Sequence, residues 1–140
     1  TWESARRTIQ SAVNSAVSFD TVVVTNGTYA AFSFTNNSEV VIQSVEGASN
    51  TVIDGNNSRR CASLGVIPDH TLTVLDGFTL SRGYSSNASG GGTYAGTVCN
   101  CDYINNRVYN SSSYGGGGSA YGNIYDCRYI RNTAYNGGGA

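Results

Sequence analysis

Residues 90–106 read GGGTYAGTVCNCDYINN, and residues 115–132 read GGGGSAYGNIYDCRYIRN. The two stretches repeat one another with an offset of 26 residues. Self-similarity at a fixed period of this length is typical of repeat architectures, in which each unit packs on the next. The offset superposes Cys101 on Cys127, Tyr103 on Tyr129, Ile104 on Ile130, Asn106 on Asn132, Tyr109 on Tyr135 and Asn110 on Asn136.

Short apolar segments occur along the whole chain between clusters of Gly, Asn, Asp and Ser. The chain is rich in Gly, Ser, Thr and Asn, a composition also found in disordered segments. Disorder does not account for β-branched and aromatic segments that are regularly bounded by turn residues, whereas short strands joined by tight turns do. The segments are TVVV, AFSF, VVIQSV, TVIDG, LTVLDGFTL, GTVCNCDYI and GNIYDCRYI.

The N-terminal residues have a different pattern. In TWESARRTIQSAVNSAV, Ala5, Ile9, Ala12, Val13 and Ala16 recur at helical spacing, which predicts one amphipathic helix within residues 1–19. No second helical pattern follows, so a fold of alternating strands and helices is excluded.

One leading helix followed only by short strands predicts an all-β fold, a right-handed parallel β-helix. In such a solenoid equivalent residues of successive coils lie directly above one another. The helix of residues 1–19 would cap the first coil and cover its open strand edge. Residues 20–140 would form the coils of one domain, either complete or part of a longer array.

The order of these segments resembles the secreted right-handed β-helix proteins of the pectate-lyase-like superfamily. The resemblance rests on TIQSAVNSAV, DTVVVTNGTY, SVEGASNTVIDG, RRCASLG and LDGFTLSRG, followed by units with GGG and C-x-(L/I/Y)-x-x-N. Repeats of this style are also found in bacterial surface proteins of the polymorphic outer-membrane and autotransporter-passenger type. The resemblance implies a secreted, extracellular or cell-surface location. It does not define an activity, because the superfamily includes lyases, hydrolases, adhesins and structural stalks.

The stacking register predicts which side chains meet. We expect Asp102 to face Arg128 as an exposed ion pair, Tyr103 to stack on Tyr129, and Asn106 to form an amide ladder with Asn132. Ile104 and Ile130 would share one column. The expected buried core positions are Val23, Val41, Ile53, Leu75, Val98 and Ile124.

Four cysteines, Cys61, Cys99, Cys101 and Cys127, admit two interpretations. Stacked Cys101 and Cys127 would have Cα atoms roughly 5 Å apart, a separation that permits a disulfide. In that case Cys61 and Cys99 remain as a second pair. Alternatively, the cysteines form a reduced ladder packed in the core.

Catalytic and metal-binding residues are not evident. CNC lacks the spacing of a zinc knuckle, and the single histidine, His70, lies far from the cysteines in the sequence. The carboxylates are scattered, and Asp54 and Asp76 each precede a glycine, as turn residues do. Asp69 beside His70 suggests an acid and base pair, although a surface turn explains both. We therefore expect no catalytic residues, metal or cofactor.

Charge and hydropathy exclude further partners. The net charge is −1 and 12% of residues are charged, which does not favour nucleic acid. No apolar run is long enough to span a membrane, so no membrane insertion is expected.

Two functions are compatible with the sequence. The first is a non-catalytic structural or adhesive module that forms a stalk or an end-to-end fibre. The second is a carbohydrate-binding or polysaccharide-degrading domain that uses tyrosines near turns: Tyr84, Tyr94, Tyr109, Tyr114, Tyr121 and Tyr135. Candidate glycosylation sites in Asn-x-Ser/Thr sequons are Asn26, Asn36, Asn56, Asn87 and Asn110.

The last residues predict self-association. NTAYNGGGA begins a third glycine-rich unit and then stops, which would leave the last coil with an unpaired strand edge. We expect this edge to be covered either by continuation of the repeat or by a neighbouring subunit.

Overall fold

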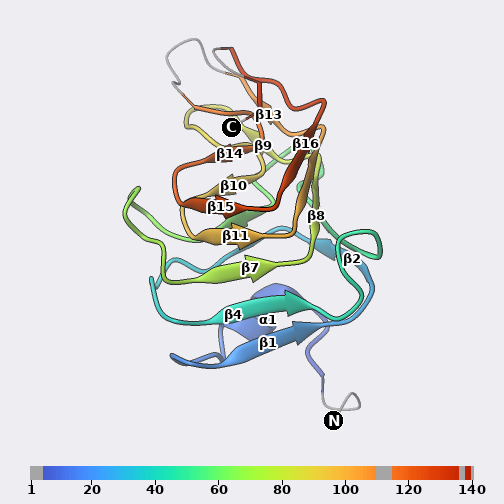
Figure 1. The fold of residues 1–140 in the computed structure, drawn as a ribbon, viewed down its shortest axis with the longest axis vertical. Coiled ribbons are helices and arrows are strands. Elements are labelled where there is room, and N and C mark those ends of the chain that lie inside the picture. Colours follow the sequence, from blue (N-terminus) through green and yellow to red (C-terminus); the bar gives the residue numbers. More distant parts are fainter. Residues whose placement is uncertain (1–4, 110–114, 136–137, 140) are drawn as a thin grey trace.

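The structure is a computed structural model that describes residues 5–109, 115–135 and 138–139. In the described part of the chain one short helix precedes a series of strands, and every strand pairing is parallel. Figure 1 shows the strands stacked coil upon coil, from β1 beside the helix to β15 near the opposite end. The chain is therefore an all-β parallel solenoid, or β-helix, as the repeat predicts.

The first sheet takes one strand from each coil, in the order β1-β4-β7-β11-β15. Each strand lies parallel to the one in the preceding coil, because the chain completes a turn before it returns to the same face. The strands are β1 (Thr21–Val24), β4 (Val41–Ser44), β7 (Val74–Asp76), β11 (Thr97–Cys99) and β15 (Asn123–Tyr125).

Three further sheets complete the coils. The second, in the order β2-β5-β8-β12-β16, comprises β2 (Gly27–Ala30), β5 (Thr51–Asp54), β8 (Thr79–Ser81), β12 (Asp102–Ile104) and β16 (Arg128–Ile130). The third comprises β3 (Phe32–Ser33), β6 (Ala62–Ser63), β10 (Thr93–Tyr94) and β14 (Ser119–Ala120). The fourth contains β9 (Tyr84–Ser85) and β13 (Arg107–Val108), and an isolated bridge joins Arg107 to Thr133.

The 26-residue repeat corresponds to the register of the last two coils. Thr93 pairs with Ser119, Val98 with Ile124 and Tyr103 with Tyr129. Earlier coils are less regular: partners are 20 residues apart between β1 and β4 and 33 residues apart between β4 and β7. Turns of variable length between the early strands hide the repeat there. We call residues 115–135, which contain β14, β15 and β16, the C-terminal coil.

The N-terminal helix is shorter than the predicted cap of residues 1–19. Helix α1 spans only Ile9–Val13, where Ile9 and Val13 are buried against β1 and β3. Thr8 is the N-cap: its backbone is extended and its side chain accepts a hydrogen bond from the Ser11 N–H. Because Thr8 caps the start of the helix, Ala5 lies outside it. Asn14 is the C-cap, so the helix ends before Ala16.

The core consists of stacked columns, one residue from each coil. One column contains Val22, Ile42, Leu75, Val98 and Ile124. The expected burial of Ile53, Leu75 and Val98 is confirmed, with no exposed side-chain surface at any of them.

Two expected core positions are wrong by one residue. Val23 is 49% exposed and Val41 is partly buried, because Val22 and Ile42 occupy the inward positions of β1 and β4. Ile124 is partly buried in the C-terminal coil. Ile104 and Ile130 pair in one column, as expected.

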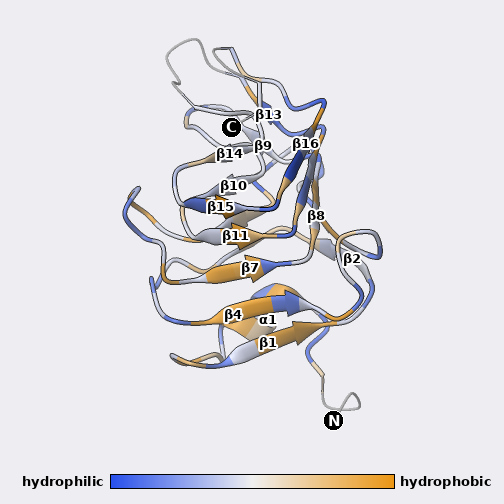
Figure 2. Cartoon of the chain, in the orientation of Figure 1, coloured by the Kyte–Doolittle hydropathy of each residue, from blue (hydrophilic) through white to orange (hydrophobic). Residues whose placement is uncertain are grey.

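The strands become more polar toward the C-terminal coil. Figure 2 shows apolar colouring over much of β1, β4 and β7, with hydrophilic segments on β15 and β16. In one inward column polar side chains follow apolar ones: Phe32 and Ala62 are followed by Thr93 and Ser119. The buried hydroxyls of Thr93 and Ser119 need hydrogen-bond partners.

Candidate functional site

The paired residues of the last two coils form the most elaborate polar arrangement in the described structure. Tyr103 stacks face to face on Tyr129, with ring centroids 4.7 Å apart and an interplanar angle of 1°. Each phenol is tied by a hydroxyl from its own coil: Thr93 lies 2.8 Å from the Tyr103 hydroxyl and Ser119 lies 2.7 Å from that of Tyr129. The stack therefore points inward and is held on both coils.

Asn106 and Asn132 form the expected amide ladder. The Asn106 side-chain amide donates to the Leu80 carbonyl at 2.8 Å and to Asn132 Oδ1 at 2.9 Å. Its Oδ1 accepts from the Gly83 N–H at 2.7 Å, and Asn132 repeats the motif by donating to the Tyr103 carbonyl. The ladder thus satisfies backbone groups at the bend of each coil.

In the described part of the chain, the outward face carries two coil-to-coil ion pairs. Arg128 Nε donates to Asp102 Oδ1 at 2.8 Å, as the register predicts. Arg82 pairs with Asp54 in the same way between β5 and the end of β8, a pair that the sequence analysis missed because its offset is not 26. The hydrogen bond from Arg82 lowers the pKa of Asp54, although burial opposes this shift.

The four cysteines are free thiols, and only two of them are brought together. Cys101 and Cys127 occupy equivalent positions at the start of β12 and β16, where the Arg128 N–H donates to the Cys101 carbonyl at 3.0 Å. Cys61 lies beside Ser81 and Asn106, on a different sheet from Cys99 in β11. Cys61 and Cys99 therefore do not form a second pair.

The environments of the cysteines differ sharply. Burial raises the pKa of the Cys61 thiol to about 12 and also raises the pKa of Cys101. For Cys127 a hydrogen bond from the Cys101 thiol outweighs burial and lowers the pKa to about 7. Cys99, partly buried near Asp76, has a raised pKa, mainly through burial.

The other predicted chemical residues do not converge. His70 Nδ1 accepts a hydrogen bond from the Val66 N–H at 3.2 Å within a turn, and its side chain makes no hydrogen bond with Asp69. Asp76 accepts from Asn100 at 2.9 Å. Within residues 5–109, 115–135 and 138–139, no group of three or more His, Cys, Asp or Glu side chains is placed to hold a metal ion.

Several tyrosines lie on the surface near the late coils. Tyr109, Tyr121 and Tyr135 are exposed, whereas Tyr84 and Tyr94 are partly buried and Tyr114 lies outside the described residues. Exposed Tyr125 was missed in the sequence because it lies within a strand rather than near a turn.

Tyr109 and Tyr135 line one open hollow of about 430 Å³ together with Arg107 and Thr133. The Arg107 guanidinium lies over the Tyr109 ring at 4.8 Å from its centroid. We call this feature the tyrosine hollow. Aromatic faces beside a guanidinium are suited to stacking and hydrogen bonding with a sugar.

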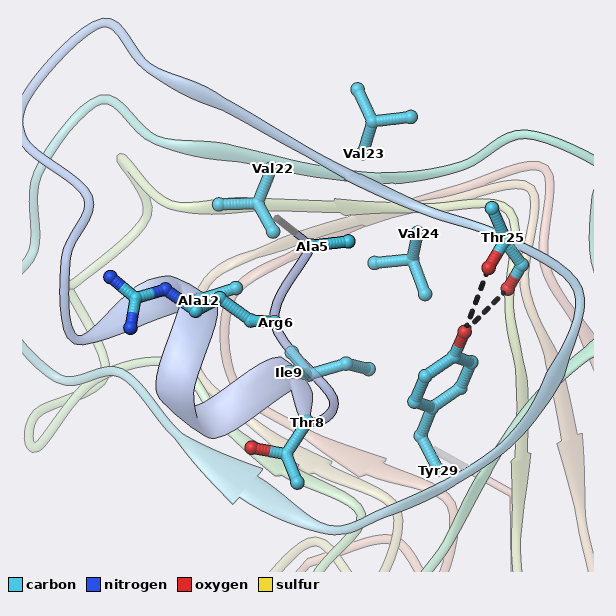
Figure 3. A pocket seen from close by; sticks show the side chains of 10 residues that line it. All are labelled: Ala5, Arg6, Thr8, Ile9, Ala12, Val22, Val23, Val24, Thr25 and Tyr29. Carbon is cyan, nitrogen blue, oxygen red and sulfur yellow. Dashed lines mark hydrogen bonds between the residues drawn. The ribbon is translucent and has the colours of Figure 1, made fainter. Parts of the chain in front are cut away.

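A second hollow lies where α1 meets β1 and β2. Figure 3 shows Ile9 and Ala12 on the helix side, Val22 and Val24 on the strand side and Tyr29 across from them. The Tyr29 hydroxyl donates to the Thr25 carbonyl at 2.9 Å, which holds the ring at the rim. The hollow of about 270 Å³ exists because a helix of five residues does not cover the whole first coil.

Asn26, Asn36, Asn56 and Asn87 are exposed, so the backbone places these four candidate glycosylation sites on the surface. The fifth candidate, Asn110, lies outside the described residues.

Comparison with known protein families, with curated proteins and with solved structures finds no match to this chain. The evidence for the fold therefore comes from the structure itself. In the described residues no helix has both the length and the apolar character needed to cross a membrane.

Proposed function

We propose that this chain is a non-catalytic structural or adhesive β-solenoid module of the extracellular surface, whose C-terminal coil is covered by a further coil. One observation carries the proposal. Val98, Cys101 and Tyr103 have no exposed surface, whereas their column partners in the C-terminal coil, Ile124, Cys127 and Tyr129, are only partly buried. The same columns therefore run to the end of the coil and present apolar surface there.

Among the residues that the structure describes, the strands at this end also have no strand paired on their outer side. β14, β15 and β16 are each the last strand of their sheet, so each has a row of backbone groups available to another strand. The opposite end differs, because α1 packs its buried face over the first coil. A surface with unpaired strands and open columns is complementary to another coil of the same repeat, whether later in the chain or in a neighbouring subunit.

The extracellular location is supported by the exposure of four sequons and by the resemblance of the segments to secreted β-helix proteins. The structural role is supported by how the polar residues are used. The ladder amides, phenols and ion pairs of the last two coils bond to one another, to hydroxyls of their own coil or to the backbone of the preceding coil.

Sedimentation velocity across a range of protein concentrations tests this proposal. We expect the chain to associate through the C-terminal coil, and Ile124→Asp to abolish association because it places a charge in an apolar column. The matched control is Val45→Asp, which introduces the same charge at an exposed position after β4. A stable monomer at high concentration, with β15 and β16 protected from hydrogen exchange, would contradict the proposal.

The tyrosine hollow supports carbohydrate binding as a second candidate function. Tyr109 is 64% exposed and Tyr135 is 71% exposed, so both rings are available to a ligand. Calorimetric titration with neutral and acidic oligosaccharides would detect binding, and Tyr135→Ala should weaken it by about tenfold, the loss of about 1.4 kcal/mol of stacking. Tyr125→Ala, an exposed tyrosine outside the hollow, should leave the affinity unchanged.

A further inference from the structure

The two stacked cysteines of the last coils have unequal access to solvent. Cys101 is fully buried, and its sulfur accepts a hydrogen bond from the Phe78 N–H at 3.3 Å. Cys127 is partly buried, because no described strand follows the C-terminal coil on that side. Cys127 therefore presents more surface to a reagent in solution than Cys101 does.

The backbone places the two thiols at disulfide distance. Their coils are hydrogen-bonded in parallel register at the adjacent pair Asp102 and Arg128, and the Arg128 N–H donates to the Cys101 carbonyl. Neighbouring strands lie about 4.8 Å apart, and disulfides join residues whose Cα atoms are about 4.4–6.8 Å apart. The two thiols make equivalent contacts in their own coils: Cys101 Sγ donates to the Cys99 carbonyl at 3.1 Å, and Cys127 Sγ donates to the Tyr125 carbonyl at 3.2 Å.

We infer that Cys127 and Cys101 form a thiol–disulfide exchange site, in which Cys127 is the attacking thiol and Cys101 is the resolving thiol. The substrate class is a low-molecular-weight disulfide. The inference concerns the chain with its C-terminal coil uncovered, because a coil that covers Cys127, as in the proposed function, would close the site to the small disulfide.

The exchange proceeds in two balanced steps. The Cys127 thiolate attacks one sulfur of the small disulfide, forms a mixed disulfide and releases one small thiolate, which takes up a proton. The sulfur of Cys101 then attacks that of Cys127, and the Cys101 proton passes to the small thiolate that leaves. The mixed disulfide breaks and releases the second small thiol. In total the protein dithiol is oxidised by two electrons, and the small disulfide is reduced to two thiols.

The other two cysteines serve as internal controls. Cys61 is fully buried. Cys99 is partly buried, and its register partners in the neighbouring coils are Tyr125 and Asp76, so no cysteine is stacked on it. Near neutral pH the lowered pKa of Cys127 gives it a larger thiolate fraction than the buried thiols of Cys61 and Cys101 have, so it should react first with the small disulfide.

The experiment is oxidation of the folded, monomeric chain with oxidised glutathione, followed by tryptic mapping. Cleavage after Arg82, Arg107 and Arg128 separates residues 83–107 from residues 108–128. The variant Cys99→Ser leaves Cys101 as the only cysteine in the first peptide. We expect the two peptides to become cross-linked without retained glutathione.

Single variants distinguish the two roles. Cys101→Ser should accumulate one glutathione on Cys127, and Cys127→Ser should acquire neither a cross-link nor glutathione at Cys101. Circular dichroism checks that each variant is folded. If a variant is unfolded, the tryptic map of oxidised Cys99→Ser is the test of the inference. The inference is overturned if Cys99→Ser keeps both thiols free, if the cross-link involves Cys61, or if Cys101 reacts in folded Cys127→Ser. The proposed function is tested separately, by measuring association of the chain, so the exchange site and the proposed function can fail independently.

Discussion

At the scale of single residues, Asn106 contributes more to the stability of the last coils than the coil-to-coil ion pairs do. It is fully buried, and its side chain hydrogen-bonds to Leu80 and Gly83 in the preceding coil and to Asn132 in the following coil. The Arg128 side chain is 70% exposed, so its pair with Asp102 is screened by solvent. The buried amide has no water to replace a lost partner.

Replacing Asn106 tests this ranking. Asn106→Ala would leave the Gly83 N–H and the Leu80 carbonyl buried without their amide partner, and should lower the free energy of unfolding by about 2–4 kcal/mol. Asn123→Ala, at an exposed position on β15, should change it by less than about 0.5 kcal/mol. Urea denaturation measures both; equal effects would show that the ladder is not a stabilising element.

At the scale of elements, the sequence predicts the strands and the late register well, and the details of the early coils poorly. The 26-residue repeat predicts that Tyr103 stacks on Tyr129, and the structure has this pairing. In TVVV and VVIQSV, adjacent apolar residues hide the period of two, so the inward positions were assigned to Val23 and Val41 instead of Val22 and Ile42.

Only those features of the candidate site that depend on the register between coils could be predicted from the sequence. The repeat alone places Cys101 next to Cys127, but the unequal exposure of the two thiols follows from the position of the C-terminal coil as the last described coil. Similarly, the hollow beside α1 could not be predicted, since the pattern continues past Asn14 while the Thr8 cap and the end at Asn14 limit the helix to five residues.

The glycine triplets have a steric explanation at the level of the strand pairs. A Cβ atom on Gly92 would lie 2.5 Å from the Gly118 carbonyl oxygen and 2.7 Å from the Tyr103 ring. Gly92 does not have a positive φ, unlike Gly90 in the same triplet with a φ of +74°, so at Gly92 close approach between coils, and not conformational freedom, requires the glycine.

Gly92→Ala should therefore destabilise the chain by about 3 kcal/mol, because the adjacent backbone cannot move away without breaking the coil pairing. Gly47→Ala is the matched control. It has no atom within 4 Å of the added Cβ but a φ of +79°, so only the conformational cost of about 1–2 kcal/mol applies. Thermal or urea unfolding distinguishes the two, and a smaller effect at Gly92 than at Gly47 would contradict the steric explanation.

At the scale of the whole molecule, the solenoid behaves as a stack in which each coil is stabilised by its neighbours. Its two described ends are unlike: α1 covers part of the first coil, and the C-terminal coil presents partly buried Ile124, Cys127 and Tyr129. A heterologous contact at such an end adds coils in one direction, which is how fibres grow. Because of this asymmetry, the contribution of a core residue to the free energy of unfolding depends on whether its coil is covered.

Val98 and Ile124 occupy one column in adjacent coils, which allows the coverage of the C-terminal coil to be measured. In the monomer, Val98→Ala should cost about 2 kcal/mol because Val98 has no exposed surface, whereas Ile124→Ala should cost only about 1 kcal/mol despite removing more atoms. If another coil covers Ile124 in the associated form, the cost of Ile124→Ala should rise to about 3 kcal/mol there, and that of Val98→Ala should stay constant. Urea denaturation at low and high protein concentration gives all four values. An Ile124→Ala cost that is the same at both concentrations, in a chain that sedimentation shows to associate, would place the contact on another surface of the solenoid.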